Sequence, residues 1–262
     1  MPVQEPTWIT IVLPMYKPGH EWERQFLTNV KELNDFVSPH TSINYIVVHD
    51  GPAPPEMKKS FENISHTFPF IQFSYYAKNQ GKGYALRHGV SLSRTAFTLT
   101  MDFDFPYRKE GIKEMIAHLQ EDHDIIVGKR SVDYFHQIPL KRKVISKLFS
   151  WLAGAFLDIP LKDTQSGIKG FNIKGKQTFL ETTINRFLVD TEFVLRASKK
   201  KQKIKTINIT PKPGLVFTNF GFRVIKTETG NFLKLIRIKY LSLQRPGTLM
   251  PAWVKRQSVA TK

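Results

Sequence analysis

The chain has 262 residues, of which 41% are hydrophobic and 20 are phenylalanine. This length and composition exclude a disordered chain and allow one large domain, or one domain with a short appendage. Lys and Arg number 39 against 22 Asp and Glu, so the net charge of +17 predicts a polyanionic partner or an acidic surface. The absence of cysteine excludes disulfides and thiolate metal sites.

The chain shows no sequence signal for export or for spanning a membrane. The first seven residues are polar and lack the charged and then apolar layout of a signal peptide. No apolar run reaches the roughly 18–20 residues that cross a bilayer. We therefore expect a cytoplasmic protein that is either soluble or peripheral on the cytoplasmic face of the membrane.

The first half of the chain alternates apolar runs with helical patterns. We expect strands over 8–14, 43–50, 70–76, 96–102 and 124–127, separated by helices over 21–36, 55–64, 83–93 and 110–120. Strands that read as continuous apolar runs are buried on both faces. The alternation therefore predicts an α/β fold with an open, mostly parallel sheet flanked by helices.

The second half is less regular, with no linker to separate it from the first. We expect a basic amphipathic helix over 140–157, a short strand over 169–172, a helix over 190–199, a strand over 204–209 and a helix over 227–243. These elements predict one main domain over residues 1–222 and a basic C-terminal extension over residues 223–262.

The C-terminal extension combines positive charge with an apolar stripe. It holds nine Lys and Arg and one acidic residue, Glu228. Its apolar side chains recur at helical spacing, at Phe232, Leu233, Ile236, Tyr240 and Leu243. This pattern suits a helix lying on an anionic membrane surface, and equally one packed on the domain core.

Two carboxylates follow the fourth expected strand, where ligands bind in an open parallel sheet. Asp102 and Asp104 are two residues apart, and in an extended segment such residues point to the same side. Mg²⁺ and Mn²⁺ take oxygen ligands of this kind and bridge to substrate phosphates. The alternative is a pair of solvated loop carboxylates.

Two further groups fall at the same edge of the expected sheet. Lys82 lies between two glycines that open a helix, where the backbone and the helix N-terminus suit a phosphate; the alternative is an ordinary turn between strand and helix. Asp50 closes the second strand, and its carboxylate suits either a hydrogen bond to a nucleoside or the capping of the turn.

Basic residues follow the fifth strand. Arg130 ends that run, and Arg142 and Ser146 are four residues apart on one face of the next expected helix. Arginine and hydroxyl groups suit a phosphate, although a solvated basic face is the alternative. Asp190 opens a helix, where capping accounts for an acidic residue.

Taken in order, these motifs resemble the GT-A glycosyltransferases that include the dolichyl- and polyprenyl-phosphate sugar synthases. The resemblance covers residues 10–211 and rests on IVLPMY (11–16), VVHDG (47–51), NQGKGYA (79–85), MDFD (101–104) and GKR (128–130), with 140–146 and 163–167 matching the lipid-phosphate synthases in particular. It implies a GT-A (Rossmann-like) fold and a metal-dependent, inverting transfer of a hexose from a nucleotide-sugar of the GDP-mannose or UDP-glucose type to a polyprenyl phosphate.

The resemblance also implies roles for individual residues. By this resemblance, the donor is bound by Pro14, Tyr16, Asp50, Lys82 and Asp102. The divalent metal, Mg²⁺ or Mn²⁺, is held by Asp102 and Asp104. The acceptor phosphate is bound by Arg130, Arg142 and Ser146. The catalytic residues are Asp102, Asp104, Arg130 and Asp163.

Two other functions remain to be weighed. A glycan or polysaccharide hydroxyl is the alternative acceptor, and it would need a carboxylate base, for which Asp163 and Glu192 are the candidates. A nucleic-acid-binding protein would account for the charge but not for the motifs, so nucleic acid is not expected as a partner. To reach a lipid acceptor, the chain would use an anionic membrane surface or a membrane-anchoring subunit.

Overall fold

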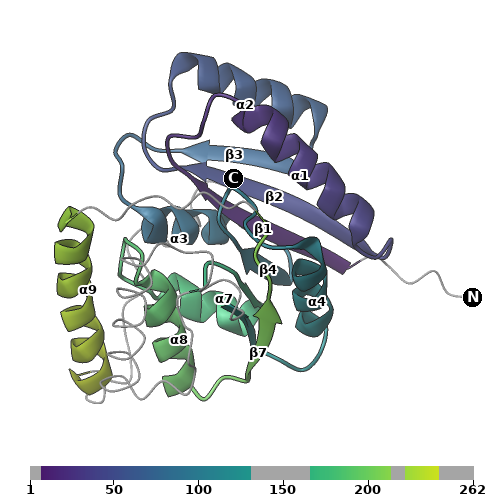
Figure 1. Ribbon diagram of the computed structural model, residues 1–262. Coiled ribbons are helices and arrows are strands. Elements are labelled where there is room, and N and C mark those ends of the chain that lie inside the picture. The colour runs from purple at the N-terminus through teal and green to yellow at the C-terminus, as the bar shows by residue number, and fades with distance from the viewer. Residues whose placement is uncertain (1–6, 131–165, 214–221, 242–262) are drawn as a thin grey trace, which may run out of the picture.

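The computed structural model of the protein describes residues 7–130, 166–213 and 222–241 (Figure 1). In these segments seven strands form one sheet: β1 (Thr7–Met15), β2 (Thr41–His49), β3 (Ile71–Tyr75), β4 (Phe97–Thr100), β5 (Ile125–Arg130), β6 (Lys169–Phe171) and β7 (Ile204–Ile209). The helices described are α1 (Trp22–Phe36), α2 (Pro55–Thr67), α3 (Lys82–Leu92), α4 (Lys109–Leu119), α7 (Ile173–Leu180), α8 (Val189–Lys199) and α9 (Phe222–Leu241).

The sheet is mostly parallel, as the sequence predicts. Its strand order is β3-β2-β1-β4-β6-β5-β7. β6 pairs antiparallel with both β4 and β5, whereas every other pairing between the named strands is parallel. The first residue of β6 therefore lies at the edge where β4 ends.

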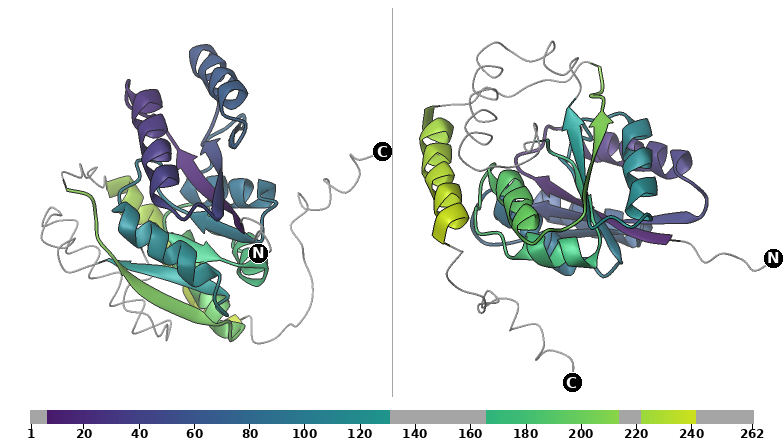
Figure 2. Two further views of the ribbon diagram at one scale, coloured as in Figure 1. Left: turned by 90° about the vertical axis from the view of Figure 1, so that its right-hand side faces the viewer. Right: turned by 90° about the horizontal axis from the view of Figure 1, so that it is seen from below.

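Helices cover both faces of the sheet, so the described part of the chain has three layers (Figure 2). On one face, α1, α2 and α4 pack a cluster of buried side chains that includes Phe26, Phe61 and Met115. On the other face, α3, α7, α8 and α9 pack a second cluster that includes Phe193 and Leu235. The strands are thus buried on both sides, which explains their continuous apolar runs.

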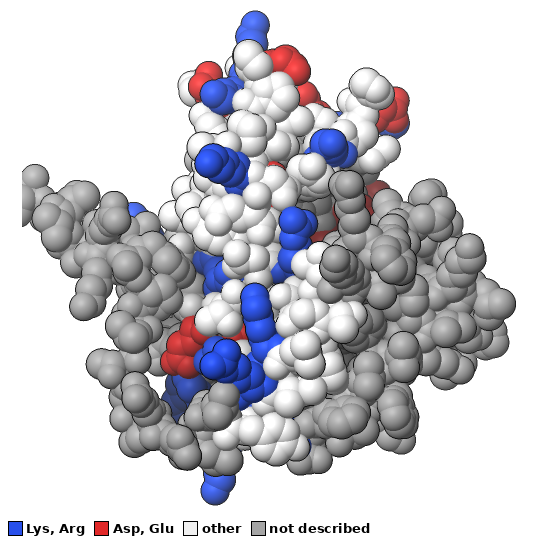
Figure 3. Space-filling model, turned by 90° about the vertical axis from the view of Figure 1, so that its left-hand side faces the viewer, with Lys and Arg blue, Asp and Glu red and all other residues white. Residues whose placement is uncertain are grey.

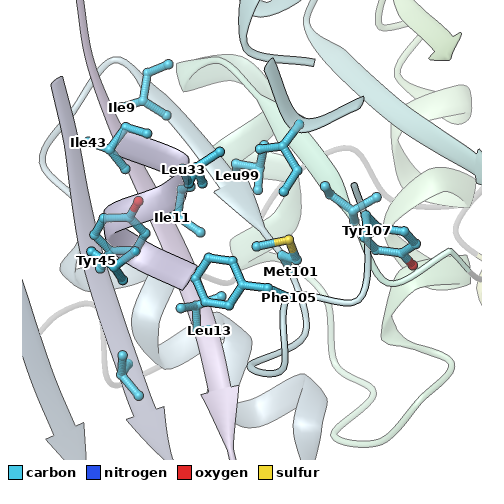
Figure 4. Packing of buried hydrophobic residues seen from close by; sticks show 14 of the residues in the cluster. Ile9, Ile11, Leu13, Leu33, Ile43, Tyr45, Leu99, Met101, Phe105 and Tyr107 are labelled. Carbon is cyan, nitrogen blue, oxygen red and sulfur yellow. The ribbon is translucent and has the colours of Figure 1, made fainter. Parts of the chain in front are cut away.

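β1 shows how one strand supplies both clusters. Ile9, Ile11 and Leu13 point to the α1 side, whereas Val12 points to the α3 side, and all four side chains are fully buried. Figure 4 shows Leu13 beside Phe105, which comes from the segment after β4. The core therefore extends past the end of β4 and anchors the chain there.

Two features of the structure differ from the expected elements, and a third expectation is not tested. β4 ends at Thr100, two residues earlier than expected, because the chain turns there. The sequence did not predict α7, although its start is marked by Asn172, whose side chain accepts a hydrogen bond from the Gly175 N–H at 3.0 Å. The helix expected over 140–157 lies outside the described residues.

α9 packs on the domain along one face and leaves another face open. Phe232 and Leu235 are buried in the second cluster, whereas 63% of Leu233 and 56% of Tyr240 are exposed. The apolar stripe read from the sequence is therefore divided between core and surface. Within the described segments, no helix combines the length and the apolar character needed to cross a bilayer.

Leu235→Ala tests the docking of α9, and Leu233→Ala on the same helix is its matched control. Because the Leu235 side chain is fully buried, we expect its truncation to lower the free energy of unfolding by about 2–5 kcal/mol in urea titrations. Leu233→Ala should change it by no more than about 0.5 kcal/mol. Equal effects of the two substitutions would contradict the packing of α9 described above.

Candidate functional site

The predicted donor-side residues gather where the parallel strands end. Met15 of β1 lies opposite His49 of β2 in the hydrogen-bonded register, and β4 ends at Thr100 on the other side of β1. β6 runs in the opposite direction, so its first residue, Lys169, pairs with Thr100. Ligands of open α/β sheets bind at this edge.

Asp102 and Asp104 lie on a turn that is anchored at every second residue. The Phe105 N–H donates to the Asp102 carbonyl oxygen at 3.2 Å, and Phe105 has a φ of 49°. The rings of Phe103 and Phe26 stack at 5.4 Å, and Phe105 is 2% exposed. The phenylalanines thus hold the two acids in place, whereas the sequence predicted an extended strand there.

Strong charges meet at this turn. The Lys82 ammonium lies 2.5 Å from Asp102 Oδ1 and 3.9 Å from Asp190 Oδ2. Burial alone would lower the pKa of Lys82, but Asp102 and Asp190 raise it above its ordinary value, so this lysine stays charged. Lost hydration and the nearby charge of Asp102 raise the pKa of Asp104.

The Asp102–Asp104 turn fits a divalent cation. Lost hydration and, after it, the neighbouring charge of Asp102 raise the pKa of Asp104, and a cation at this turn would offset the repulsion between the two carboxylates. In the described ranges, no three His, Cys, Asp or Glu side chains converge on one point. The described residues would thus offer two carboxylates, leaving other coordination positions to further ligands such as phosphate and water, as is usual for Mg²⁺.

A buried ion pair behind Lys82 was not predicted from the sequence. Lys169 Nζ lies 2.8 Å from Asp190 Oδ1, and both side chains are almost fully buried. The sequence predicts a helix cap at Asp190 and no role for Lys169. The available signal was a lysine inside the otherwise apolar run of β6, which has to find a partner when it is buried.

The glycines around Lys82 allow a close approach of protein backbone. A methyl group on Gly81 would lie 2.4 Å from the Asn185 carbonyl oxygen, and one on Gly83 would lie 2.3 Å from the Ile184 carbonyl oxygen. The Gly83 N–H donates to the Asn185 carbonyl oxygen at 2.9 Å. The phosphate interpretation of this motif therefore rests on the Lys82 side chain rather than on these glycines.

The segment at residues 183–185 is held from two helices. Arg87 of α3 donates to the Ile184 carbonyl oxygen at 2.7 Å. Glu192 of α8 has no exposed surface and accepts hydrogen bonds from the N–H groups of Thr183 and Ile184 and from Arg196. A carboxylate occupied in this way is unsuited to act as a general base.

The Asp50 carboxylate is engaged in hydrogen bonds with the segment that precedes α3. It accepts hydrogen bonds from the Tyr76 hydroxyl at 2.7 Å, the Asn79 side chain at 2.8 Å and the N–H groups of Gln80 and Gly81 at 2.8 and 2.9 Å. Burial and this hydrogen bond raise the pKa of Tyr76, so its hydroxyl remains a donor. Asp50 fixes the loop that carries Lys82.

Pro14 and Tyr16 lie at the end of β1 beside the turn that follows β2. Pro14 is opposite Val48 in the register of these strands. The Tyr16 side chain is 55% exposed, and the Lys17 ammonium lies 5.4 Å from the centre of its ring. An exposed aromatic ring at this edge suits the stacking of a base.

Of the predicted acceptor residues, the structure describes Arg130 alone. Arg130 is the last residue of β5 and lies opposite Ile209 of β7, so it is at the same edge of the sheet as Asp102. Arg142, Ser146 and Asp163 lie outside the described residues.

The chain belongs to glycosyl transferase family 2, whose family model matches residues 10–178. A dolichyl-phosphate beta-glucosyltransferase of Dictyostelium discoideum is 23% identical over 248 residues, which cover 89% of this chain and 75% of that protein. The glycosyltransferase AglD of Haloferax volcanii is also 23% identical, over 208 residues; the match covers 78% of this chain but only a third (33%) of that protein.

Solved structures show that the fold is GT-A. A mannosyl-3-phosphoglycerate synthase from Rubrobacter xylanophilus superimposes with a TM-score of 0.67 at 11% identity, covering 94% of this chain and 78% of that one. A glucosyl-3-phosphoglycerate synthase from Mycobacterium tuberculosis, in complex with Mn²⁺, UDP and phosphoglyceric acid, has a TM-score of 0.63 at 10% identity, covering 92% and 80%.

Asp50→Asn tests the loop contacts around Asp50. An amide nitrogen cannot accept the hydrogen bonds that one carboxylate oxygen now accepts, so we expect the free energy of unfolding to fall by about 1–3 kcal/mol. Asp35→Asn is the matched control, because Asp35 is exposed and, among the described residues, forms its ion pair with Lys31 on the same helix. If Asp50→Asn were no less stable than Asp35→Asn, Asp50 would not hold the loop.

Proposed function

We propose that this protein is an inverting hexosyltransferase that uses a nucleotide-sugar of the GDP-mannose or UDP-glucose type and a polyprenyl or dolichyl phosphate at the membrane surface. The observation that carries the proposal is the contact of Lys82 with Asp102, beside Asp104, at the ligand-binding edge of the sheet. A charged lysine and two crowded carboxylates suit a diphosphate that binds together with a divalent cation.

Each described residue at this edge has a role in the proposal. A divalent cation held by Asp102 and Asp104 would offset the charge of the diphosphate leaving group. Lys82 binds a diphosphate oxygen, Tyr16 contacts the base, and Asp50 positions the loop that carries Lys82. Binding in this arrangement leaves the anomeric carbon open to attack from the opposite side, which inverts its configuration.

A phosphate acceptor fits the described residues better than a hydroxyl acceptor. A phosphate oxygen is already anionic and needs no general base, whereas a hydroxyl does. Glu192, one of the two predicted bases, is occupied by backbone hydrogen bonds, which removes it as a base for a hydroxyl acceptor. Arg130 would hold the acceptor phosphate, together with Arg142 and Ser146. The similarity to a dolichyl-phosphate glucosyltransferase favours the same acceptor class.

The open face of α9 suits an anionic membrane surface. Leu233 and Tyr240 are exposed there together with Lys234 and Arg237. Figure 3 views the molecule from the side of α9 and shows basic side chains set among uncharged surface, with smaller groups of acidic side chains. Apolar and aromatic groups enter the interface while Lys and Arg meet anionic headgroups. A membrane-anchoring subunit is the other route to a lipid acceptor.

The proposal is tested by a transfer assay with a panel of UDP- and GDP-sugars, Mn²⁺ or Mg²⁺, and a polyprenyl phosphate or its dephosphorylated alcohol. We expect metal-dependent transfer to the phosphate and none to the alcohol. Donor turnover without transfer to the polyprenyl phosphate would indicate that the acceptor is a glycan hydroxyl instead. No turnover of any donor would overturn the proposal.

Asp102→Asn should abolish donor turnover while leaving the thermal midpoint of unfolding close to that of the wild type. The charge that pairs with Lys82 is lost, but the turn keeps its phenylalanine anchors. Gly167→Ala perturbs the same carboxylate differently, because its methyl group would lie 2.3 Å from Asp102 Oδ2. Gly19→Ala, which meets nothing within 4 Å, is the control. Full activity of Asp102→Asn would disprove the metal assignment.

Leu233→Glu should weaken co-sedimentation with anionic vesicles about tenfold, because it removes an apolar group and adds a repelled charge. Ile173→Glu on α7 is the control, since Ile173 is 57% exposed and its substitution changes the charge equally. Equal binding by both variants would exclude α9 as the membrane-binding surface.

A further inference from the structure

Lys169 is the most unusual charged residue in the described core. It has no exposed surface, and as the first residue of β6 it lies between Thr100 of β4 and Val127 of β5. Its ammonium lies 2.8 Å from Asp190 Oδ1 and also donates to the Ser166 carbonyl oxygen. Burying an ammonium group costs free energy, and pairing it with a carboxylate only offsets that cost. An apolar residue at this position would stabilise the sheet at least as well as the paired lysine does.

Asp190 connects this buried lysine to the ligand-binding edge. Its Oδ1 pairs with Lys169, and its Oδ2 lies 3.9 Å from the Lys82 ammonium. Lys82 is closer to Asp102, at 2.5 Å. The four groups form a row of alternating charge, from Lys169 through Asp190 and Lys82 to Asp102.

In this row two carboxylates compete for Lys82. Asp102 and Asp190 are both within 4 Å of its ammonium. The side chains of Lys82 and Asp190 are only 17% and 5% exposed, and attraction between charges is stronger where water is excluded. Lys169 offsets the charge of Asp190 and so weakens its pull on Lys82. Without Lys169, Asp190 would draw Lys82 away from Asp102.

We propose that Lys169 is a positioning residue, which neutralises Asp190 from behind and so keeps Lys82 at Asp102, ready to bind the donor diphosphate. This inference rests on the proposed function, because it assigns the diphosphate to Lys82. The proposal also accounts for the direction of β6. Because β6 is antiparallel to β4, its first residue, Lys169, pairs with the last residue of β4, Thr100, and so lies close to the Asp102–Asp104 turn.

The experiment measures the binding of UDP and GDP by calorimetry, in EDTA and in Mg²⁺, together with thermal unfolding. Lys169→Gln keeps an amide donor near Asp190 but removes the charge, and we expect it to weaken binding at least about tenfold in both buffers. Lys169→Gln/Asp190→Asn removes the competing charge as well, so its binding should recover to near the wild-type value. Lys176→Gln is the control, since Lys176 of α7 is half-buried and donates to Ser93 away from the site.

A purely structural role gives a different pattern. Lys169→Gln would then unfold at a lower temperature, but the folded protein would bind nucleotide as tightly as the wild type, which would overturn the inference. A folded double variant with weak binding would also overturn it, and this holds even if Lys169→Gln alone fails to fold. If the wild type bound neither nucleotide, the proposed function would fail together with the inference. Tight wild-type binding with unchanged variants would reject the inference alone.

Discussion

The contact between Lys82 and Asp102 is the interaction on which the rest of the site depends. Each partner is fixed from the core: Asp102 by the buried phenylalanines that follow it, and Lys82 by a loop held to Asp50. Lys82 is mostly shielded from water, with 17% of its side chain exposed, and the loss of hydration there offsets much of the attraction to Asp102, so stability alone does not explain a lysine at this position. The pair is better explained as part of a binding site for an anionic ligand, a diphosphate that binds together with a divalent cation.

The surrounding backbone is built to hold this contact. The glycines on both sides of Lys82 let residues 184 and 185 approach the start of α3, where a methyl group would clash. Arg87 and Glu192 then fix that segment, which leads directly into α8 and Asp190. Glu192, a candidate base from the sequence, thus serves together with Arg87 to position the chain. Family membership alone would not separate these supporting residues from those that meet substrate.

The sequence predicted the architecture well because strands buried on both faces and amphipathic helices leave clear periodic patterns. It also predicted the edge of the sheet where Asp50, Lys82 and Asp102 meet, since strand ends can be located from such patterns. It could not predict that Asp50 would be saturated by the Asn79–Gly81 loop, or that Lys169 would lie behind Asp190, because both depend on contacts between distant segments. It left the role of α9 open, and the structure shows a helix that is partly core and partly surface.

The central claim is that Lys82 and the Asp102–Asp104 turn receive the diphosphate of the donor. The most direct test is a crystal structure of the protein with Mn²⁺ and the nucleoside diphosphate that binds most tightly. The account predicts Mn²⁺ at Asp102 and Asp104, with the Lys82 ammonium moved from Asp102 to a phosphate oxygen. A nucleotide bound elsewhere, with the contact between Lys82 and Asp102 intact, would contradict it.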